Sequence, residues 1–304
     1  MNKINTAQGF GPLETMPHGA DQIPDIDEVG IAWRDNAVFV WWDPESETYG
    51  QVHVSTTPNG EGSRARAAVT VAGRSFEIND PLPPGTFASE SISVDLTGHV
   101  TVNHERLVLD PRLEPLFTPV DWASIRALPE ARPGMTLNHY QHGAVARGTV
   151  IIDDESSKFE GTAWRDRTWG YREESAQWLE YFYLTSVFGH DHAIVLWKVL
   201  GADQRTRMFG AHISDEGQVP IDTFTVVRDP AANFAGGTVD LPSGRLTLNV
   251  VPKRTPFTGW WLPMGCTRQE GPTFCEFDEY FVLTSSDGDR GAGLAAHGIL
   301  RSIV

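Results

Sequence analysis

Short runs of strand-forming residues recur through almost the whole chain, and this rhythm constrains the fold more than any other feature. The runs are rich in Val, Phe, Trp and Thr, and turn-forming Gly, Pro, Asn and Asp separate them. Residues 37–42 have the pattern of a buried strand, and residues 50–56 alternate as a half-buried strand does. No amphipathic helix of more than about two turns is evident. The sequence therefore predicts an all-β protein.

A proline-rich stretch near the middle of the chain interrupts this rhythm. At 304 residues the chain suits two domains of roughly 150 residues each. Runs spaced about 8 to 14 residues apart are typical of a β-sandwich or barrel. We therefore predict an irregular N-terminal arm (1–28), an N-terminal β domain (29–110), a proline-rich connection (111–136) and a C-terminal β domain (137–304). Within the connection, only 121–128 has the pattern of a short helix.

Charge and cysteine content limit the partners and the compartment. A net charge of −16 disfavours nucleic acid and anionic membranes, because both would repel the chain. No window approaches the ~20 apolar residues of a membrane span, and the N-terminus lacks the pattern of a signal peptide. Cys266 and Cys275 are too few for a disulfide scaffold; two reduced thiols are favoured over a single bridge. We expect a cytoplasmic protein.

Residues 164–172, Trp-Arg-Asp-Arg-Thr-Trp-Gly-Tyr-Arg, form the motif with the most chemical content. Trp and Arg both combine large apolar bodies with polar tips, which suits the wall of a ligand pocket. An Asp between two Arg has its charged form stabilised. The structural alternative is an Arg-Asp-Trp network at a strand end, because ion-pair networks perturb pKa values without being catalytic.

Two further groups could carry chemistry. His190 and His192 would share one face of a strand, which makes a metal site the weaker alternative, and we expect no metal. Glu276, Asp278 and Glu279 form an acidic cluster on a late strand. Alternation predicts Glu276 and Asp278 on one face of that strand and Glu279 on the other.

The motif and its surroundings resemble a family of uncharacterised bacterial proteins. That family is related to the AttH-type and hydroxyneurosporene synthase (carotenoid 1,2-hydratase) superfamily. The shared pattern reads Gly, a few residues, then Arg-Asp-(His/Arg)-(Ser/Thr/Asn)-Trp-Gly-x-Arg. It is carried here by 138–141, 148–150, Gly161 and 165–172, and 39–44 resembles the family's aromatic strand followed by Asp-Pro.

The resemblance implies two lipocalin-like (calycin-like) antiparallel β-barrel or sandwich domains and a ligand site. Characterised members of the superfamily include hydratases of isoprenoid double bonds and lipocalin-like cyclases. They resemble each other in using a dry aromatic pocket without a metal or organic cofactor, so none is expected here.

This chain departs from the carotenoid hydratases at several positions of the motif. Three residues match the shared pattern: Asp166, Trp169 and Arg172. Arg167 stands where the hydratases have His, and Thr168 where they have Asn. Their Tyr-Asp pair on a following strand would fall near 197–198, where this chain has no acid. The resemblance therefore implies the scaffold more strongly than the carotenoid reaction.

We therefore expect a cofactor-free lyase or isomerase, of hydratase, dehydratase or cyclase type, that transfers protons to a hydrophobic terpenoid, steroid-like or polyketide substrate. The catalytic candidates are Asp166, His139, Arg172 and Arg167. Asp166 would donate or accept the proton, His139 is the side chain that titrates nearest neutral pH, and the arginines would set the pKa and orientation of Asp166. The substrate-binding candidates are Trp42, Trp169, Trp197, Tyr140, Tyr171 and Glu276. The alternative is a non-catalytic lipocalin-like carrier of a hydrophobic small molecule. A homodimer is left open.

Overall fold

A computed structural model of the chain describes residues 9–124, 130, 132–135, 137–173, 177–251, 261–264 and 273–301. Within these ranges nearly all regular structure is antiparallel β-strand, and the helical pieces are short turns. The all-β prediction is therefore confirmed. The chain divides into two compact units, residues 1–173 and 174–304.

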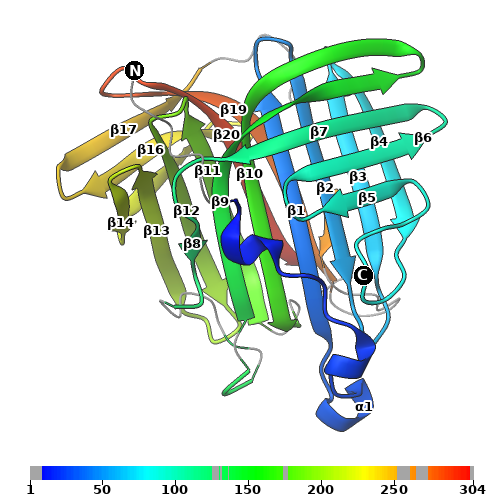
Figure 1. Cartoon of the computed structure of the whole chain (residues 1–304). Coiled ribbons are helices and arrows are strands. Elements are labelled where there is room, and N and C mark those ends of the chain that lie inside the picture. The colour runs from blue at the N-terminus through cyan, green and yellow to red at the C-terminus, as the bar shows by residue number, and fades with distance from the viewer. Residues whose placement is uncertain are drawn as a thin grey trace. The chain divides into compact units, whose positions relative to one another are not determined.

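The first unit contains one sheet preceded by three helical turns (Figure 1). The turns are η1 (Gly11–Glu14), η2 (Ala20–Gln22) and α1 (Ile26–Val29). The strands are β1 (Trp33–Asp43), β2 (Thr48–Thr56), β3 (Arg64–Val71), β4 (Arg74–Pro81), β5 (Ile92–Asp95), β6 (His99–His104), β7 (Leu107–Pro115), β8 (Val120–Asp121), β9 (Leu137–Ile152) and β10 (Glu155–Tyr171).

Strands β9 and β10 form the longest hairpin of this sheet, and they sit in its middle. The order is β4-β3-β2-β1-β10-β9-β7-β6-β5, with β8 paired to β9. In Figure 1 the green hairpin lies between the blue β1 and the cyan-green β7. Residues at the start and the end of the first unit therefore pair side by side.

This pairing corrects the predicted domain boundary. Residues 137–171 were expected in the C-terminal domain, but β10 pairs with β1 from Trp33↔Tyr171 to Trp42↔Thr162. Residues 111–115, expected in the connection, are the end of β7, whose side chains alternate between buried and exposed. Proline is tolerated there because it occupies a position that makes no pair with β6. Local sequence shows where strands occur, but the partner of a strand depends on distant residues.

One face of the first sheet packs a hydrophobic core. Alternation along β1 sends Ala37, Phe39 and Trp41 to this face, where all three are completely buried. The Trp41 ring stacks on Phe159 with centroids 5.8 Å apart. Gly50 lies opposite Trp41 in the register, and its missing side chain leaves the space that the indole ring fills.

The N-terminal arm is an integral part of this core. It was predicted as irregular, but it contains short helical turns, and Leu13 in η1 and the preceding Phe10 are both completely buried. The guanidinium carbon of Arg165 lies 4.1 Å from the centroid of the Phe10 ring. Arg167 NH2 donates to the carbonyl oxygen of Thr15 at 3.0 Å. The arm is held because its apolar residues are buried and its carbonyls accept from buried arginines.

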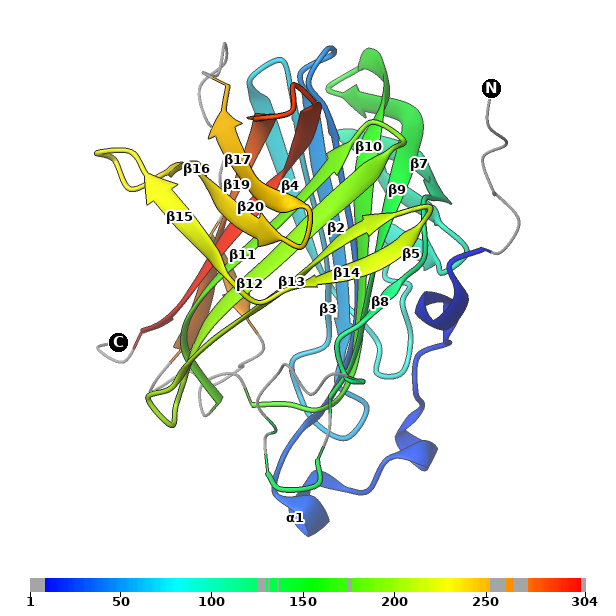
Figure 2. The same ribbon diagram turned by 90° about the vertical axis from the view of Figure 1, so that its left-hand side faces the viewer.

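The second unit repeats the plan of a single antiparallel sheet (Figure 2). Its strands are β11 (Trp178–Phe188), β12 (His192–Gly201), β13 (Thr206–Ser214), β14 (Gly217–Ile221), β15 (Phe224–Arg228), β16 (Phe234–Leu241), β17 (Gly244–Val250), β18 (Trp261–Met264), β19 (Thr273–Ser285) and β20 (Arg290–Arg301). The order is β14-β13-β12-β11-β20-β19-β17-β16-β15, with β18 on β19. One face buries a core that includes Phe182, Leu184, Leu196, Phe234 and Phe281.

Gly50→Ala should destabilise the first unit, because the added methyl group would overlap the Trp41 ring. Overpacking of this kind costs about 1–3 kcal/mol of unfolding free energy. Denaturant titration followed by tryptophan fluorescence measures the loss. Gly60→Ala is the matched control, because its nearest atoms would lie at an ordinary 3.4 Å. Equal unfolding midpoints for the two variants would contradict the packing described here.

Phe10→Ala should lower the unfolding free energy by about 3–5 kcal/mol, because it removes a fully buried ring from beneath the Arg165 guanidinium. The arm should also become sensitive to protease. Met16→Ala in the same arm alters a side chain that is 72% exposed, and it should change stability by no more than about 0.5 kcal/mol. If Phe10→Ala is as stable as Met16→Ala, the arm does not hold the core together.

Candidate functional site

Strand β10 divides the 164–172 motif between the two faces of the first sheet. Asp166 and Thr168 point to one face, and Arg165, Arg167 and Trp169 point to the core side. We call the first of these the Asp166 face. The register aligns Asp166 with Val38 on β1 and with Gln141 on β9, and it aligns Thr168 with His139.

Asp166 is held by two neighbours from β9. His139 Nε2 lies 2.6 Å from Asp166 Oδ2, and Gln141 Nε2 donates to the same oxygen at 2.6 Å. Gln141 is fixed in turn because its Oε1 accepts from Trp122 Nε1 at 2.8 Å. His139 and Gln141 are two residues apart on one strand, so both reach the same carboxylate. The structure thus brings two of the predicted catalytic candidates, Asp166 and His139, into contact.

The carboxylate of Asp166 is the more accessible member of the pair. Its side chain is 20% exposed, whereas that of His139 is 4% exposed. Burial alone would raise the pKa of Asp166, but His139, Gln141 and the Arg172 guanidinium together lower it below the usual value. Asp166 is therefore an ionised group at neutral pH.

Arg172 and His53 complete the polar surroundings of Asp166. Arg172 lies just beyond β10, and its NH1 donates to Thr168 Oγ1 at 3.3 Å. His53 on β2 shares a cross-strand row with Val38 and Asp166. Burial is the main reason that the pKa of His53 is lowered to about 3, with nearby arginines adding to the effect and Asp166 opposing it. His53 is thus a neutral ring in the same cross-strand row as the ionised Asp166, with Val38 of β1 between them.

Arg167 does not belong to this site, which corrects one of the catalytic candidates. Its side chain is completely buried on the core side, where NH1 donates to a carboxylate oxygen of Asp35 and to the carbonyl of Asn36 at 2.9 Å. Arg165 is buried on the same side and donates to the carbonyl of Leu96 at 2.7 Å. Adjacent strand residues point to opposite faces, so an arginine next to Asp166 in sequence faces away from it.

The aromatic candidates of the first unit fall into two places. Tyr140 and Trp169 stack on the core side, with ring centroids 5.5 Å apart, and Tyr171 packs edge-on against Trp33 at 5.1 Å. These rings lie beside the arm, away from Asp166. Trp42 is on the Asp166 face but is completely buried, and it lies four positions from Val38, about 13 Å along β1.

Trp197 and Glu276 belong to the second unit. Trp197 packs between Tyr183 and Phe209, with centroid distances of 4.4 and 6.2 Å. The hydroxyl of Tyr181, another ring beside Trp197, donates to Glu276. The register places Glu276 and Asp278 on this aromatic face, and Glu279 on the other. The predicted division of the acidic cluster between two faces is confirmed.

Sequence reasoning did not select Gln141 or His53 as site residues. Gln141 follows His139 at the spacing of two that places side chains on one face of a strand, and this signal was available. His53 could not be found in that way, because its nearness to Asp166 depends on the pairing of β2 with β1 and of β1 with β10.

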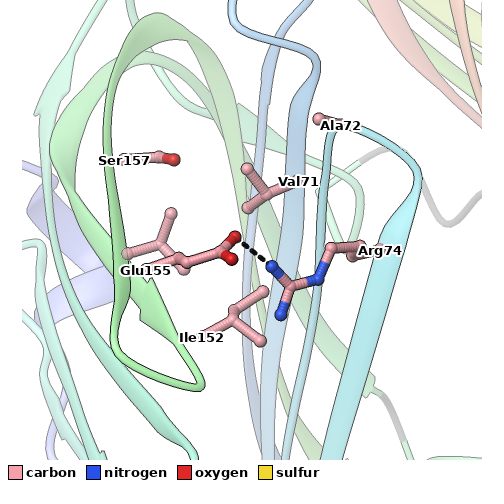
Figure 3. Close-up of a pocket in the computed structure, with 7 residues that line it drawn as sticks. Val71, Ala72, Arg74, Ile152, Glu155 and Ser157 are labelled. Atoms are coloured by element: carbon pink, nitrogen blue, oxygen red, sulfur yellow. Dashed lines mark hydrogen bonds and ion pairs between the residues drawn. The ribbon is translucent and has the colours of Figure 1, made fainter.

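A small cavity of the first unit lies beside the turn between β9 and β10. Its volume is about 110 Å³, and Val71, Val150 and Ile152 line it. Figure 3 shows the ion pair between Arg74 and Glu155 at this cavity. The volume is well below the ~300 Å³ of typical ligand pockets, so we do not assign it a substrate.

The remaining predictions concern metal ligands, cysteines and membranes. His192 and His212 have rings 5.0 Å apart, and the described residues contain no cluster of three or more metal-ligating side chains. Cys275 is a free, half-buried thiol, and Cys266 lies outside the described residues. The helices in the described part of the chain are all too short and too polar to cross a membrane.

Comparison with solved structures defines the class of fold. An AttH-like protein (NE1406) from Nitrosomonas europaea matches with a TM-score of 0.61 and 14% identity, over 95% of this chain and 98% of that one. CghA matches with a TM-score of 0.60 and 11% identity, over 98% and 95% of the two chains. Kievitone hydratase from Nectria haematococca matches with a TM-score of 0.58 and 12% identity, over the same shares. The expected pair of lipocalin-like β domains of the AttH and carotenoid-hydratase type is confirmed.

Residues 25–298 match the family described as Domain of unknown function (DUF7064), and the chain belongs to that family. No curated protein matches the chain. Identities of 11–14% to the solved structures establish a shared fold, and a shared fold does not fix a reaction.

His53 should stay neutral down to about pH 3–4, because the folded protein lowers its pKa to about 3. An unfolded histidine binds a proton below about pH 6.5, so the unfolded state binds more protons in this window. The unfolding free energy should therefore decrease as the pH is lowered from about 6.5 to 3. This residue contributes up to ~1.4 kcal/mol per pH unit to the decrease. Ring nitrogen chemical shifts measure the ionisation directly.

His53→Gln should weaken this pH dependence of the unfolding free energy, whereas His190→Gln, at an exposed turn, should leave it unchanged. A His53 ring that titrates near pH 6.5 would show that it is not buried among cations in the way described.

Proposed function

We propose that the chain is a cofactor-free lyase or isomerase of hydratase type, in which Asp166 and His139 transfer a proton to and from the substrate. The observation that carries this proposal is the 2.6 Å contact between the buried His139 ring and the partly exposed Asp166 carboxylate. A general acid–base group needs an accessible atom and a second group that stores or supplies its proton. This pair provides both.

The roles follow from burial and charge. Asp166 is the member that can reach a substrate, and its lowered pKa suits a base or an anion that stabilises a developing cation. His139 is the proton store, because its Nε2 contacts Asp166 Oδ2. Gln141 fixes the carboxylate by donating to the same oxygen, and His139, Gln141 and Arg172 together lower its pKa.

In the hydration direction, the proton shared by the pair moves to one carbon of a substrate double bond. Water then adds to the neighbouring carbon and returns one proton to the pair. A C–H and a C–O bond form, the π bond and one O–H bond of water break, and the protonation of the pair is restored. The reverse sequence is a dehydration, and attack by a second double bond in place of water would be a cyclisation.

The comparisons support this class without identifying the substrate. One protein with the same fold is named as a hydratase, and the sequence resembles a superfamily of hydratases and cyclases. A hydrophobic terpenoid, steroid-like or polyketide substrate is the proposal that agrees with that resemblance. Trp42 and Trp164 lie on the Asp166 face, where both are buried and make that part of the sheet apolar.

Incubation with a panel of terpenes, sterols and polyenes in heavy water tests the proposal. A product that carries solvent deuterium is expected, and mass spectrometry detects it. Asp166→Asn and His139→Gln should each lower the rate by roughly 10²–10⁴-fold, the usual contribution of general acid–base catalysis. Asp110→Asn is the matched control, because it breaks an exposed Asp–His pair with His99 on the same sheet and should leave the rate unchanged.

Three results would contradict proton transfer by this pair. The first is full activity of Asp166→Asn. The second is a new product that has the substrate's elemental composition and carries no deuterium, which would indicate a pericyclic reaction governed by shape. The third is a ligand that binds and returns unchanged from every incubation, which would indicate a carrier.

A further inference from the structure

The second unit contains a cavity that the proposed function does not use. Its volume is about 380 Å³, within the range of roughly 300–1,000 Å³ typical of ligand sites. Phe182, Leu200 and Val226 provide apolar surface, and Lys198 and Arg228 provide two positive charges. Phe182 lies on β11 and Lys198 and Leu200 on its neighbour β12, whereas Val226 and Arg228 lie on β15, an edge strand of the same sheet. The cavity thus combines apolar walls with cations.

Arg228 is held in place by neighbours that leave part of its guanidinium free. Its NH1 donates to the carbonyl of Ala232 at 3.0 Å and lies 3.3 Å from His297 Nε2. The guanidinium carbon is 5.6 Å from the centroid of the Phe182 ring. Among the described residues its Nε and NH2 groups have no hydrogen-bond partner. A guanidinium fixed in this way can bind a carboxylate without first becoming ordered.

A buried acid, Glu279, is connected to Arg228 through His297. Glu279 is 2% exposed, and its Oε2 accepts from the Phe234 amide at 2.9 Å and lies 3.0 Å from His297 Nε2. His297 therefore stands between Glu279 and Arg228. Glu279 Oε1 is buried without a hydrogen-bond partner, and no ion pair joins Glu279 to Arg228 among the described residues. The Arg228 cation therefore remains available to a ligand.

Lys198 is the second cation, and it has no ion pair or hydrogen bond within the described part of the chain. It lies opposite Phe182 in the register of β11 and β12, on the face that also carries His297. Glu180 lines the same cavity two residues before Phe182 and adds one negative charge. Two cations and one exposed acid favour a ligand with a single negative charge over a dianion.

We propose that this cavity binds a small amphiphilic monocarboxylate. Its carboxylate would lie between Lys198 and Arg228, and its apolar part would lie against Phe182, Leu200 and Val226. Charge-assisted hydrogen bonds to the two cations give the specificity for an acid, and the three apolar side chains give the affinity for a hydrocarbon or an aromatic body.

Isothermal titration of the full chain with decanoate, decanol and decyltrimethylammonium tests the site. Decanoate should bind with a stoichiometry of one, and the alcohol and the cation should bind at least about tenfold more weakly, since charge-assisted hydrogen bonds contribute roughly 1.5–3 kcal/mol. Lys198→Gln and Arg228→Gln should each weaken decanoate binding by about tenfold or more. Lys158→Gln removes an exposed lysine from β10 and should leave binding unchanged.

The variants distinguish decanoate binding at this cavity from non-specific electrostatic attraction and from misfolding. Lys198→Gln removes an exposed side chain without a partner, so its near-ultraviolet circular dichroism should equal that of the parent even if Arg228→Gln is destabilised. The proposal is overturned by three results: no decanoate binding, equal binding of decanoate and decanol, or equal weakening by Lys158→Gln and Lys198→Gln. Proton-transfer activity that depends on Asp166 is a separate measurement, so either proposal can fail alone.

Discussion

The two buried guanidinium groups of β10 hold the first unit together. Arg165 lies between the rings of Phe10 and Phe39, at 4.1 and 4.4 Å from their centroids, and Arg167 forms a fully buried ion pair with Asp35. Burial lowers the pKa of Arg165 to about 9, with Arg167 adding to the effect. Burying such charges is costly unless they are paired or hydrogen-bonded.

The N-terminal arm and the sheet together offset the cost of burying these two guanidinium groups. Carbonyl oxygens of Thr15, Asn36 and Leu96 accept from the two arginines, and the aromatic rings of Phe10 and Phe39 receive the face of Arg165. The arginines therefore tie the arm, β1 and the segment after β5 to β10. The same strand that anchors the core also presents Asp166 on its other face, so the candidate site is built on a rigid element.

Asp166 shows how a polar site is tuned by neighbours from other strands. His139, Gln141 and Arg172 outweigh the effect of burial and keep the carboxylate ionised, while His53 stays neutral because its surroundings are buried and rich in arginine. Asp166 and His53 lie in one cross-strand row, and the pKa values of both are lowered. At neutral pH this leaves Asp166 ionised and His53 uncharged. The second unit places its cations differently, at the cavity beside Phe182.

The sequence alone determined the all-β class, the strands and the alternation of side chains. It also brought Asp166 and His139 together as candidates, and it divided Glu276 and Asp278 from Glu279, because periodicity is a local property of neighbouring residues. Tertiary structure decided which strands pair. It moved 137–171 into the first unit, set Arg167 against Asp35 at a separation of 132 residues, and placed His53 in one cross-strand row with Asp166. Strand pairing joins distant residues through backbone hydrogen bonds that almost any sequence can form, so the local pattern cannot specify the partner.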